Sequence, residues 1–148
     1  MDKTMIVNSP EETMDFARTY VANLPDKVII TLAGDLAAGK TTFTKGLAQG
    51  IGVTDLVDSP TFTIIKEYTT GHLPLYHIDA YRLDADADID FLLEYFDKSG
   101  ICVIEWASNI QNDLPENRID ITICRLDGDR REIQIKNRLE QVNVNVSD

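Results

Sequence analysis

The chain has little cysteine and a shortage of positive charge, and each scarcity excludes a class of protein. Its two cysteines, Cys102 and Cys124, lie in apolar stretches without metal-ligand spacing, so we expect buried free thiols in a reducing compartment. Lys and Arg total 14 against 25 Asp and Glu, which gives a net charge of −11. This balance disfavours direct binding to DNA or RNA, which requires a basic face.

Long apolar runs are also absent. No stretch approaches the roughly 18 uninterrupted apolar residues of a membrane-spanning helix, and the N-terminus lacks the apolar core of a signal peptide. Hydrophobic residues make up 43% of the chain and charged residues 26%, the balance of a globular protein. We therefore expect one domain over residues 1–148, located in the cytoplasm and without a membrane partner.

The charge is distributed unevenly along the chain. Residues 79–97 contain seven acids and one base, whereas residues 118–138 contain six bases against four acids. These segments form either two ordinary solvated surfaces or two patches for different partners.

The apolar pattern alternates between helical and extended segments. Ser9, Pro10 and Glu12 have the chemistry of a helix start with a capping box. Helices are expected over residues 10–23, 40–50 and 89–96. Strands are expected over residues 27–33, 62–68, 75–78, 101–104, 119–123 and 133–135.

Two of these strands, 27–33 and 101–104, are continuously apolar, which is typical of the buried centre of a parallel sheet. The last two strands alternate around an Asp127-Gly128 turn and predict a hairpin at an antiparallel edge. The predicted fold class is α/β, a mostly parallel central sheet flanked by helices, with antiparallel strands that include this C-terminal hairpin.

The strongest local motif is GDLAAGKT at residues 34–41, which matches G-x-x-x-x-G-K-[ST] between a buried strand and a helix. Glycines let the backbone N–H groups turn towards phosphate oxygens, and the helix N-terminus adds partial positive charge. Lys40 can reach the β- and γ-phosphates, and the Thr41 hydroxyl is placed to ligate Mg²⁺. The predicted nucleotide-binding residues of this P-loop are Gly34, Ala37, Ala38, Gly39, Lys40, Thr41 and Thr42.

A P-loop needs carboxylates nearby, and two acids follow short apolar strands. Glu105 follows residues 101–104 and can hold Mg²⁺ directly or through water, or it can be a cap or salt-bridge partner. Asp79 follows residues 75–78 and can orient a water molecule, with the same structural alternatives. Thr61 can offer its hydroxyl to Mg²⁺ or the γ-phosphate, or it can belong to a Ser-Pro turn.

Two further residues near these acids are interpreted as structural. We expect Trp106, the only tryptophan, to lie in the core, although packing near a nucleotide is the alternative. We expect His77 to pack or to form a hydrogen bond rather than to bind a metal.

The class of P-loop protein follows by elimination. A GTPase should carry an N-K-x-D motif, and the sequence has none. A small-molecule kinase remains the alternative, although the acidic 79–97 segment is a poor lid for a phosphorylated substrate. We favour a P-loop NTPase-like ATPase with ATP and Mg²⁺ as cofactors, slow until a partner completes its site. A nucleotide-sensing module with negligible turnover is a third possibility.

Four motifs in this order resemble the TsaE family (also called YjeE), bacterial ATPases of tRNA threonylcarbamoyladenosine biosynthesis. They are GDLAAGKTT at 34–42, SPTFT at 59–63, HIDAYRL at 77–83 and VIEW at 103–106. The resemblance covers about residues 9–136 and implies a small parallel-centred sheet flanked by helices. One departure is Ala37, where the family usually has a glycine.

The resemblance also implies roles for individual residues. Thr41 and Glu105 would be the Mg²⁺ ligands, Asp79 would be needed for hydrolysis, and Thr61 would belong to a nucleotide-sensing switch.

The family further has a threonine in the first helix and an arginine in the C-terminal hairpin, both near the nucleotide. The best matches are Thr13 and Arg130, with Arg131 as the alternative to Arg130.

The implied partner is the TsaB–TsaD complex, which transfers threonylcarbamoyl to N6 of adenosine 37 in tRNAs reading ANN codons. The protein would supply a cycle of ATP binding and hydrolysis and would meet tRNA only through that complex.

Overall fold

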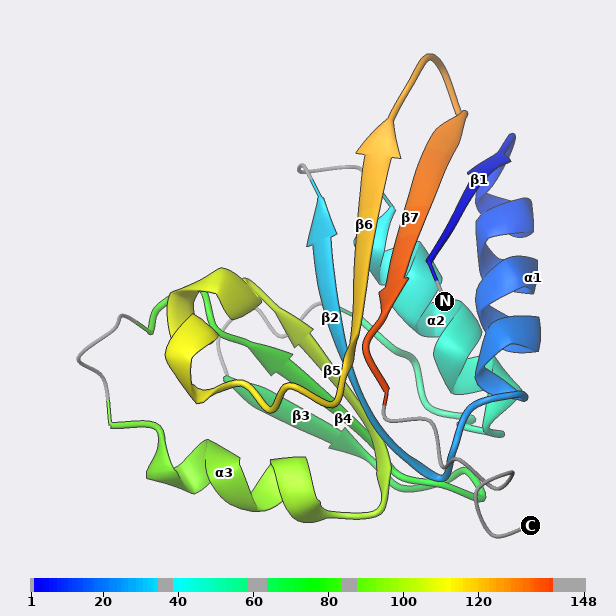
Figure 1. Cartoon of the computed structure of the whole chain (residues 1–148). Coiled ribbons are helices and arrows are strands. Elements are labelled where there is room, and N and C mark those ends of the chain that lie inside the picture. The colour runs from blue at the N-terminus through cyan, green and yellow to red at the C-terminus, as the bar shows by residue number, and fades with distance from the viewer. Residues whose placement is uncertain (1, 35–38, 59–63, 84–87, 140–148) are drawn as a thin grey trace, which may run out of the picture.

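The computed structural model describes residues 2–34, 39–58, 64–83 and 88–139. The chain forms one seven-stranded mixed sheet with helices on both faces, in the strand order β1-β7-β6-β2-β5-β4-β3 (Figure 1). The elements are β1 (Lys3–Val7), α1 (Pro10–Val21), β2 (Lys27–Gly34), α2 (Lys40–Gly50), β3 (Ile65–Tyr68), β4 (Leu75–Asp79), α3 (Asp90–Asp97), β5 (Gly100–Glu105), the 3₁₀ segment η1 (Ala107–Asp113), β6 (Ile119–Arg125) and β7 (Arg131–Asn137). The predicted α/β class is confirmed.

The centre of the sheet is parallel. β2 pairs in parallel with both β5 and β6, and β5 pairs in parallel with β4. The continuously apolar segments are therefore the central strands, as predicted. The carboxyl ends of these four strands lie at the same edge of the sheet, which brings the ends of β2, β4 and β5 together.

The predicted place of the C-terminal hairpin at the edge of the sheet is wrong. β6 and β7 do pair antiparallel, but β1 pairs antiparallel with β7 and forms the edge itself. In this register Met5 is opposite Ile133 and Lys3 is opposite Ile135. The alternating pattern of residues 133–135 fits an inner strand as well as an edge strand. The outer neighbour of β7 is β1, which comes from the other end of the sequence.

The first helix begins as expected. The Ser9 side chain accepts a hydrogen bond from the Glu12 main-chain N–H, and Pro10 occupies the first turn. The Glu12 carboxylate accepts from the main-chain N–H of Asn8, one residue before the cap, at 2.9 Å. The helix ends at Val21, two residues before the predicted end.

α1 and α2 pack closely and run in the same direction. A Cβ atom at Gly46 would lie 2.4 Å from the Met14 carbonyl oxygen, and one at Gly50 would lie 2.2 Å from a methyl group of Val21. Only glycine allows this approach, so the two glycines of α2 set its distance from α1. Because they run in the same direction, both helices begin at the edge of the sheet where β2 ends (Figure 1).

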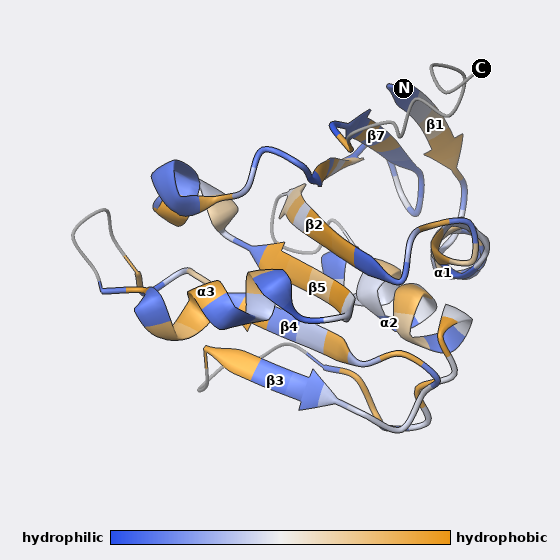
Figure 2. Cartoon of the chain, turned by 60° about the horizontal axis from the view of Figure 1, so that its bottom comes forward, coloured by the Kyte–Doolittle hydropathy of each residue, from blue (hydrophilic) through white to orange (hydrophobic). Residues whose placement is uncertain are grey.

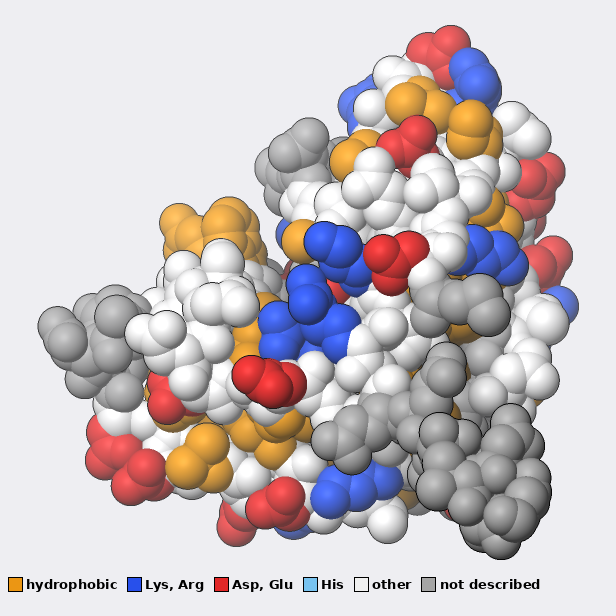
Figure 3. All heavy atoms as spheres, in the orientation of Figure 1, with side chains coloured by type: hydrophobic (Ala, Val, Ile, Leu, Met, Phe, Trp, Pro, Cys, Tyr) orange, Lys and Arg blue, Asp and Glu red, His pale blue; other side chains and the backbone are white. Residues whose placement is uncertain are grey.

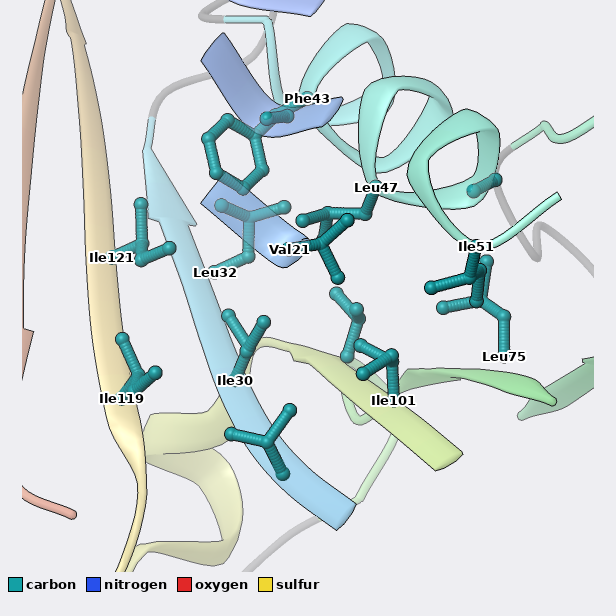
Figure 4. Packing of buried hydrophobic residues seen from close by; sticks show 14 of the residues in the cluster. Val21, Ile30, Leu32, Phe43, Leu47, Ile51, Leu75, Ile101, Ile119 and Ile121 are labelled. Atoms are coloured by element: carbon teal, nitrogen blue, oxygen red, sulfur yellow. The ribbon is translucent and has the colours of Figure 1, made fainter. Parts of the chain in front are cut away.

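Two apolar clusters fill the space on either side of the sheet. The larger one lies under α1 and α2 and includes Ile30, Leu32, Phe43 and Leu47, whose side chains converge in Figure 4. The smaller one lies under α3 and η1 and includes Ile104 and the buried side chains of α3 (Figure 2).

The two cysteines differ in their burial. Both are free, but Cys102 is buried in the smaller cluster, whereas Cys124 is only partly buried. The expectation of two buried thiols therefore holds for Cys102 and is wrong for Cys124. Within the described ranges, none of the helices combines the length and the apolar character that crossing a membrane would require.

Candidate functional site

Three of the predicted site residues, Asp79, Glu105 and Lys40, lie at the edge where the parallel strands end. Asp79, the last residue of β4, is opposite Glu105, the last residue of β5, and Glu105 is opposite Leu32 of β2. Residues opposite one another in neighbouring strands share a face of the sheet. Both carboxylates therefore lie on the face that α2 covers, beside the start of that helix at Lys40.

Glu105 connects a lysine and a histidine in this corner. Its Oε1 atom lies 3.7 Å from Nζ of Lys40, and its Oε2 atom lies 2.6 Å from Nε2 of His77. His77 is fully buried and Glu105 is 6% exposed. Burial raises the pKa of Glu105, but the hydrogen bond with His77 and the charge of Lys40 lower it by more, so the net pKa lies below its ordinary value. Glu105 is therefore a buried carboxylate at neutral pH, and His77 forms the expected hydrogen bond.

Asp79 is held by the turn that follows β4. Its Oδ1 atom accepts a hydrogen bond from the Tyr81 main-chain N–H at 2.9 Å. The Asn109 side chain donates to the carbonyl oxygens of Ala80 and Tyr81, which fixes this turn against η1. Among the described residues, the Oδ2 atom of Asp79 has no hydrogen-bond partner, so this half-buried carboxylate can accept a proton or orient water.

The interpretation of Trp106 as a core residue is wrong. Its side chain is 46% exposed, and its φ angle of 58° makes it the one non-glycine residue with positive φ in the described part of the chain. The chain leaves β5 through this left-handed residue, which turns the indole out of the sheet. The ring packs edge-on against Tyr81, with centroids 4.9 Å apart, and lies 5.6 Å from Nζ of Lys40.

The structure describes Gly34, at the start of the predicted phosphate loop, and Gly39, which leads into α2. Gly39 has a φ angle of 105° and its carbonyl oxygen accepts from the Phe43 N–H at 2.9 Å, so it is the cap of α2. No atom lies within 4 Å of a Cβ built on Gly39, so its requirement for glycine is conformational. Thr41 and Thr42 lie half-buried in the first turn of α2. Three predicted residues lie outside the described ranges: Ala37, Ala38 and Thr61.

Thr13 and Arg130 contact other residues than Lys40 in the described part of the chain. Thr13 is buried in the first turns of α1, where its hydroxyl donates to the Ser9 carbonyl oxygen at 3.3 Å. Arg130 lies in the β6–β7 turn and contacts Asp127 at 3.2 Å. Because Ile123 of β6 is opposite Gly34, this turn extends beyond the same edge of the sheet. Both residues lie towards the edge of the sheet where β2 ends, without a described contact to Glu105 or Lys40.

One polar cluster was not predicted. Asp120 on β6 accepts hydrogen bonds from Thr31, Arg118 and Arg138. The alternation of 119–123 indicates that Asp120 faces away from α1 and α2, but no local pattern shows which partners reach it.

The architecture and the site together define the class. A parallel-centred sheet whose central strand leads through a glycine-flanked loop into a helix is a P-loop-like α/β fold. The structure is similar to the crystal structure of Bacillus subtilis YdiB, with a TM-score of 0.81 and 43% sequence identity, covering 93% of this chain and 86% of that one.

The sequence comparisons identify the family. The family model of threonylcarbamoyl adenosine biosynthesis protein TsaE matches residues 7–133, and the chain belongs to this family. It is 49% identical over 137 residues to the tRNA threonylcarbamoyladenosine biosynthesis protein TsaE of Bacillus subtilis, covering 90% of this chain and 87% of that one. It is 42% identical over 110 residues to the TsaE of Haemophilus influenzae, covering 73% and 69% respectively.

Proposed function

We propose that this chain is a Mg²⁺-dependent ATPase that serves the threonylcarbamoyladenosine modification at position 37 of tRNAs reading ANN codons. In this role it acts with a TsaB–TsaD complex through a cycle of ATP binding and hydrolysis. Membership of the TsaE family supports the pathway. The net charge of −11 favours contact with tRNA through the complex rather than directly.

One observation carries the ATPase proposal: Lys40 and the buried Glu105 meet at 3.7 Å where α2 begins. A lysine at the start of a helix is suited to the β- and γ-phosphates, because the helix N-terminus also attracts anions. A carboxylate at the end of the neighbouring strand is suited to a cation bound to those phosphates. The pair therefore provides both charges that a Mg²⁺–triphosphate requires.

The oxygen donors at this edge fit Mg²⁺. Mg²⁺ prefers oxygen ligands and is commonly held by one or two protein groups, with phosphate oxygens and water completing its shell. Glu105 and the Thr41 hydroxyl are such groups. No cluster of three metal-binding His, Cys, Asp or Glu side chains occurs in the described ranges, which fits an ion that binds together with its nucleotide. When bound, Mg²⁺ would neutralise charge on the β- and γ-phosphates.

The remaining residues have distinct roles in the proposal. Hydrolysis joins a water oxygen to the γ-phosphorus and breaks the bond to the oxygen that bridges to the β-phosphorus. Asp79 orients this water through its Oδ2 atom, because its Oδ1 atom accepts the hydrogen bond from Tyr81. Thr61 senses the γ-phosphate. Thr13 and Arg130 bind the nucleotide from the two elements that flank the loop.

Nucleotide binding is tested by comparing Lys40→Ala with Lys45→Ala, which removes the same charge from the same helix. Lys40→Ala should weaken ATP binding by at least about ten-fold, because charge-assisted contacts to the phosphates are lost. Lys45→Ala should bind ATP like the unaltered protein. Equal ATP affinity of the two variants would contradict the assignment of the loop.

The reaction is tested with ATP labelled on the γ-phosphate. Label released as inorganic phosphate supports an ATPase, whereas label on an acceptor indicates a kinase. In a reconstituted modification assay with TsaB–TsaD, omission of this protein or its replacement by Asp79→Ala should prevent multiple turnover. Undiminished product formation without the protein would contradict the proposed role.

A further inference from the structure

A pocket adjoins the candidate site at Lys40 and extends along the face of the sheet opposite α1 and α2. On this face α3 and η1 cover β3, β4 and β5, but none of the described helices covers β6 and β7 (Figures 1 and 2). Between η1 and the open side of β2 and β6 is a pocket of about 380 Å³, which we call the η1–β6 pocket. Its lining includes Thr31, Trp106, Gln111, Arg118, Asp120 and Arg138.

The charged residues of this pocket form a fixed network. The Nε atoms of Arg118 and Arg138 donate to the two carboxylate oxygens of Asp120 at 2.9 and 2.8 Å, and the Thr31 hydroxyl donates at 2.6 Å. Arg118 is 8% exposed and also donates to the Pro115 carbonyl oxygen at 2.9 Å. One carboxylate between two guanidinium groups leaves an excess of one positive charge in a chain whose net charge is −11.

Arg138 has N–H groups that are available to bind a ligand. It uses only Nε towards Asp120, and its two terminal nitrogens have no hydrogen-bond partner among the described residues. Its side chain is 46% exposed at the pocket mouth. A guanidinium edge of this kind matches the two oxygens of a carboxylate. Figure 3 shows Lys and Arg side chains gathered in the middle of this face.

We propose that the η1–β6 pocket binds an acidic side chain, Asp or Glu, of a partner protein. The third cation of the lining, Lys40, is paired with Glu105 at 3.7 Å, so the Asp120 network supplies the one excess positive charge of the pocket. One positive charge suits a single carboxylate, whereas an RNA backbone requires a series of compensating cations. One acidic residue, Glu116, lines the adjoining depression next to Arg118 and Arg138. Apolar walls from Leu114 and Trp106 can contact the aliphatic part of the side chain.

Trp106 connects this pocket to the candidate nucleotide site. Its ring lines the pocket and also lies 5.6 Å from Nζ of Lys40, which lines the pocket as well. A bound side chain therefore changes the surroundings of the indole. Because this is the only tryptophan in the chain, its fluorescence reports binding without a label.

The proposal is tested by titrating the full chain with the capped peptide Gly-Glu-Gly, with capped Gly-Gln-Gly as the neutral control. Tryptophan fluorescence and the NMR signal of the Arg138 Nε–H group are followed. We expect saturable changes with the acidic peptide in the range of about 1 mM, and binding at least about ten-fold weaker with the neutral one. Arg138→Gln should abolish the response. Arg138→Lys should keep part of it, because the charge remains but the planar edge is lost.

Arg18→Gln is the matched control, because Arg18 is 51% exposed and paired with Asp15 on the outer side of α1. It should leave peptide binding unchanged. Equal binding of the two peptides, no saturable change, or an unchanged response in Arg138→Gln would overturn the proposal. A uridine trinucleotide that shifts the same signals more tightly than the acidic peptide would overturn it in favour of RNA. If Arg138→Gln does not fold, Arg138→Lys tests the proposal instead, and an undiminished response in that variant would overturn it.

The same variants can be taken to the TsaB–TsaD complex. If the unaltered protein binds the complex and Arg138→Gln binds equally well, the pocket is not the docking site, while the proposed function stands. If the unaltered protein does not bind the complex, the proposed function fails and the peptide titration alone decides the role of the pocket.

Discussion

The substitution Gly46→Ala tests the close packing of α1 against α2. A Cβ atom at this position would lie 2.4 Å from the Met14 carbonyl oxygen and 2.7 Å from the Cβ atom of Ala17. Since side-chain Cβ atoms essentially never approach other atoms within 3.0 Å, the two helices have to separate by at least about 0.6 Å. Neither neighbouring atom can rotate aside, because one belongs to the main chain and the other is bonded directly to it.

Two opposing effects set the magnitude of the change. Alanine is favoured over glycine inside a helix by about 1 kcal/mol. Overpacking that shifts the backbone costs about 1–3 kcal/mol. The shift also loosens Ala17 and Val21, which are 0% and 4% exposed in the larger core cluster. We expect a net loss of about 1–2 kcal/mol in the free energy of unfolding, which lowers Tm by about 2–8 °C for a chain of this size.

Urea unfolding followed by circular dichroism measures this loss as a lower midpoint at an unchanged slope. Gln49→Ala on the exposed side of the same helix is the control and should change the free energy of unfolding by less than about 0.5 kcal/mol. If Gly46→Ala were as stable as the unaltered protein or more stable, the close approach of α1 to α2 would be refuted.

Three further predictions concern single residues. Hydrogen bonds from Thr31, Arg138 and Arg118 outweigh the effect of burial, so the pKa of Asp120 lies below its ordinary value. The ionised Asp120 therefore stabilises the folded protein above about pH 4, and this stabilisation is lost at lower pH. Asp120→Asn should therefore lose about 1–2 kcal/mol of unfolding free energy at pH 7, with the difference from the unaltered protein shrinking as the pH falls below about 4; a constant difference would contradict this. Burial raises the pKa of the Cys102 thiol to about 12, so a thiol reagent should modify Cys124 first in the folded protein, and equal labelling would count against this burial. Gly39→Ala should cost about 1–2 kcal/mol through its positive φ alone, which thermal unfolding would detect as a lower Tm.

Local sequence patterns were sufficient to predict the segments in which all residues have similar surroundings. β2 is buried on both faces, so its continuous apolar run identified it without knowledge of its neighbours. α2 begins at Lys40 and ends at Gly50 as expected, because a glycine cap and the phosphate-loop motif mark its start.

The rest depends on contacts between distant segments. β1 contains only five residues and becomes a strand through its pairing with β7, about 130 residues later in the chain. The exposure of Trp106 follows from the left-handed turn after β5, and a lone tryptophan next to an apolar strand gives no sign of that turn. The Asp120 network joins three segments, so its partners could not be identified from any one of them.

The order of the strands in the sheet determines when this protein can fold during its synthesis on the ribosome. β2 pairs with β5 and β6, so the strand that leads into the predicted phosphate loop has no neighbour until residues 100–125 have been translated. Fragments that end earlier contain the whole GDLAAGKT motif but lack the framework that holds it. Such nascent chains should neither retain nucleotide nor resist proteolysis, and the proposed ATP site should form only when most of the chain has left the exit tunnel.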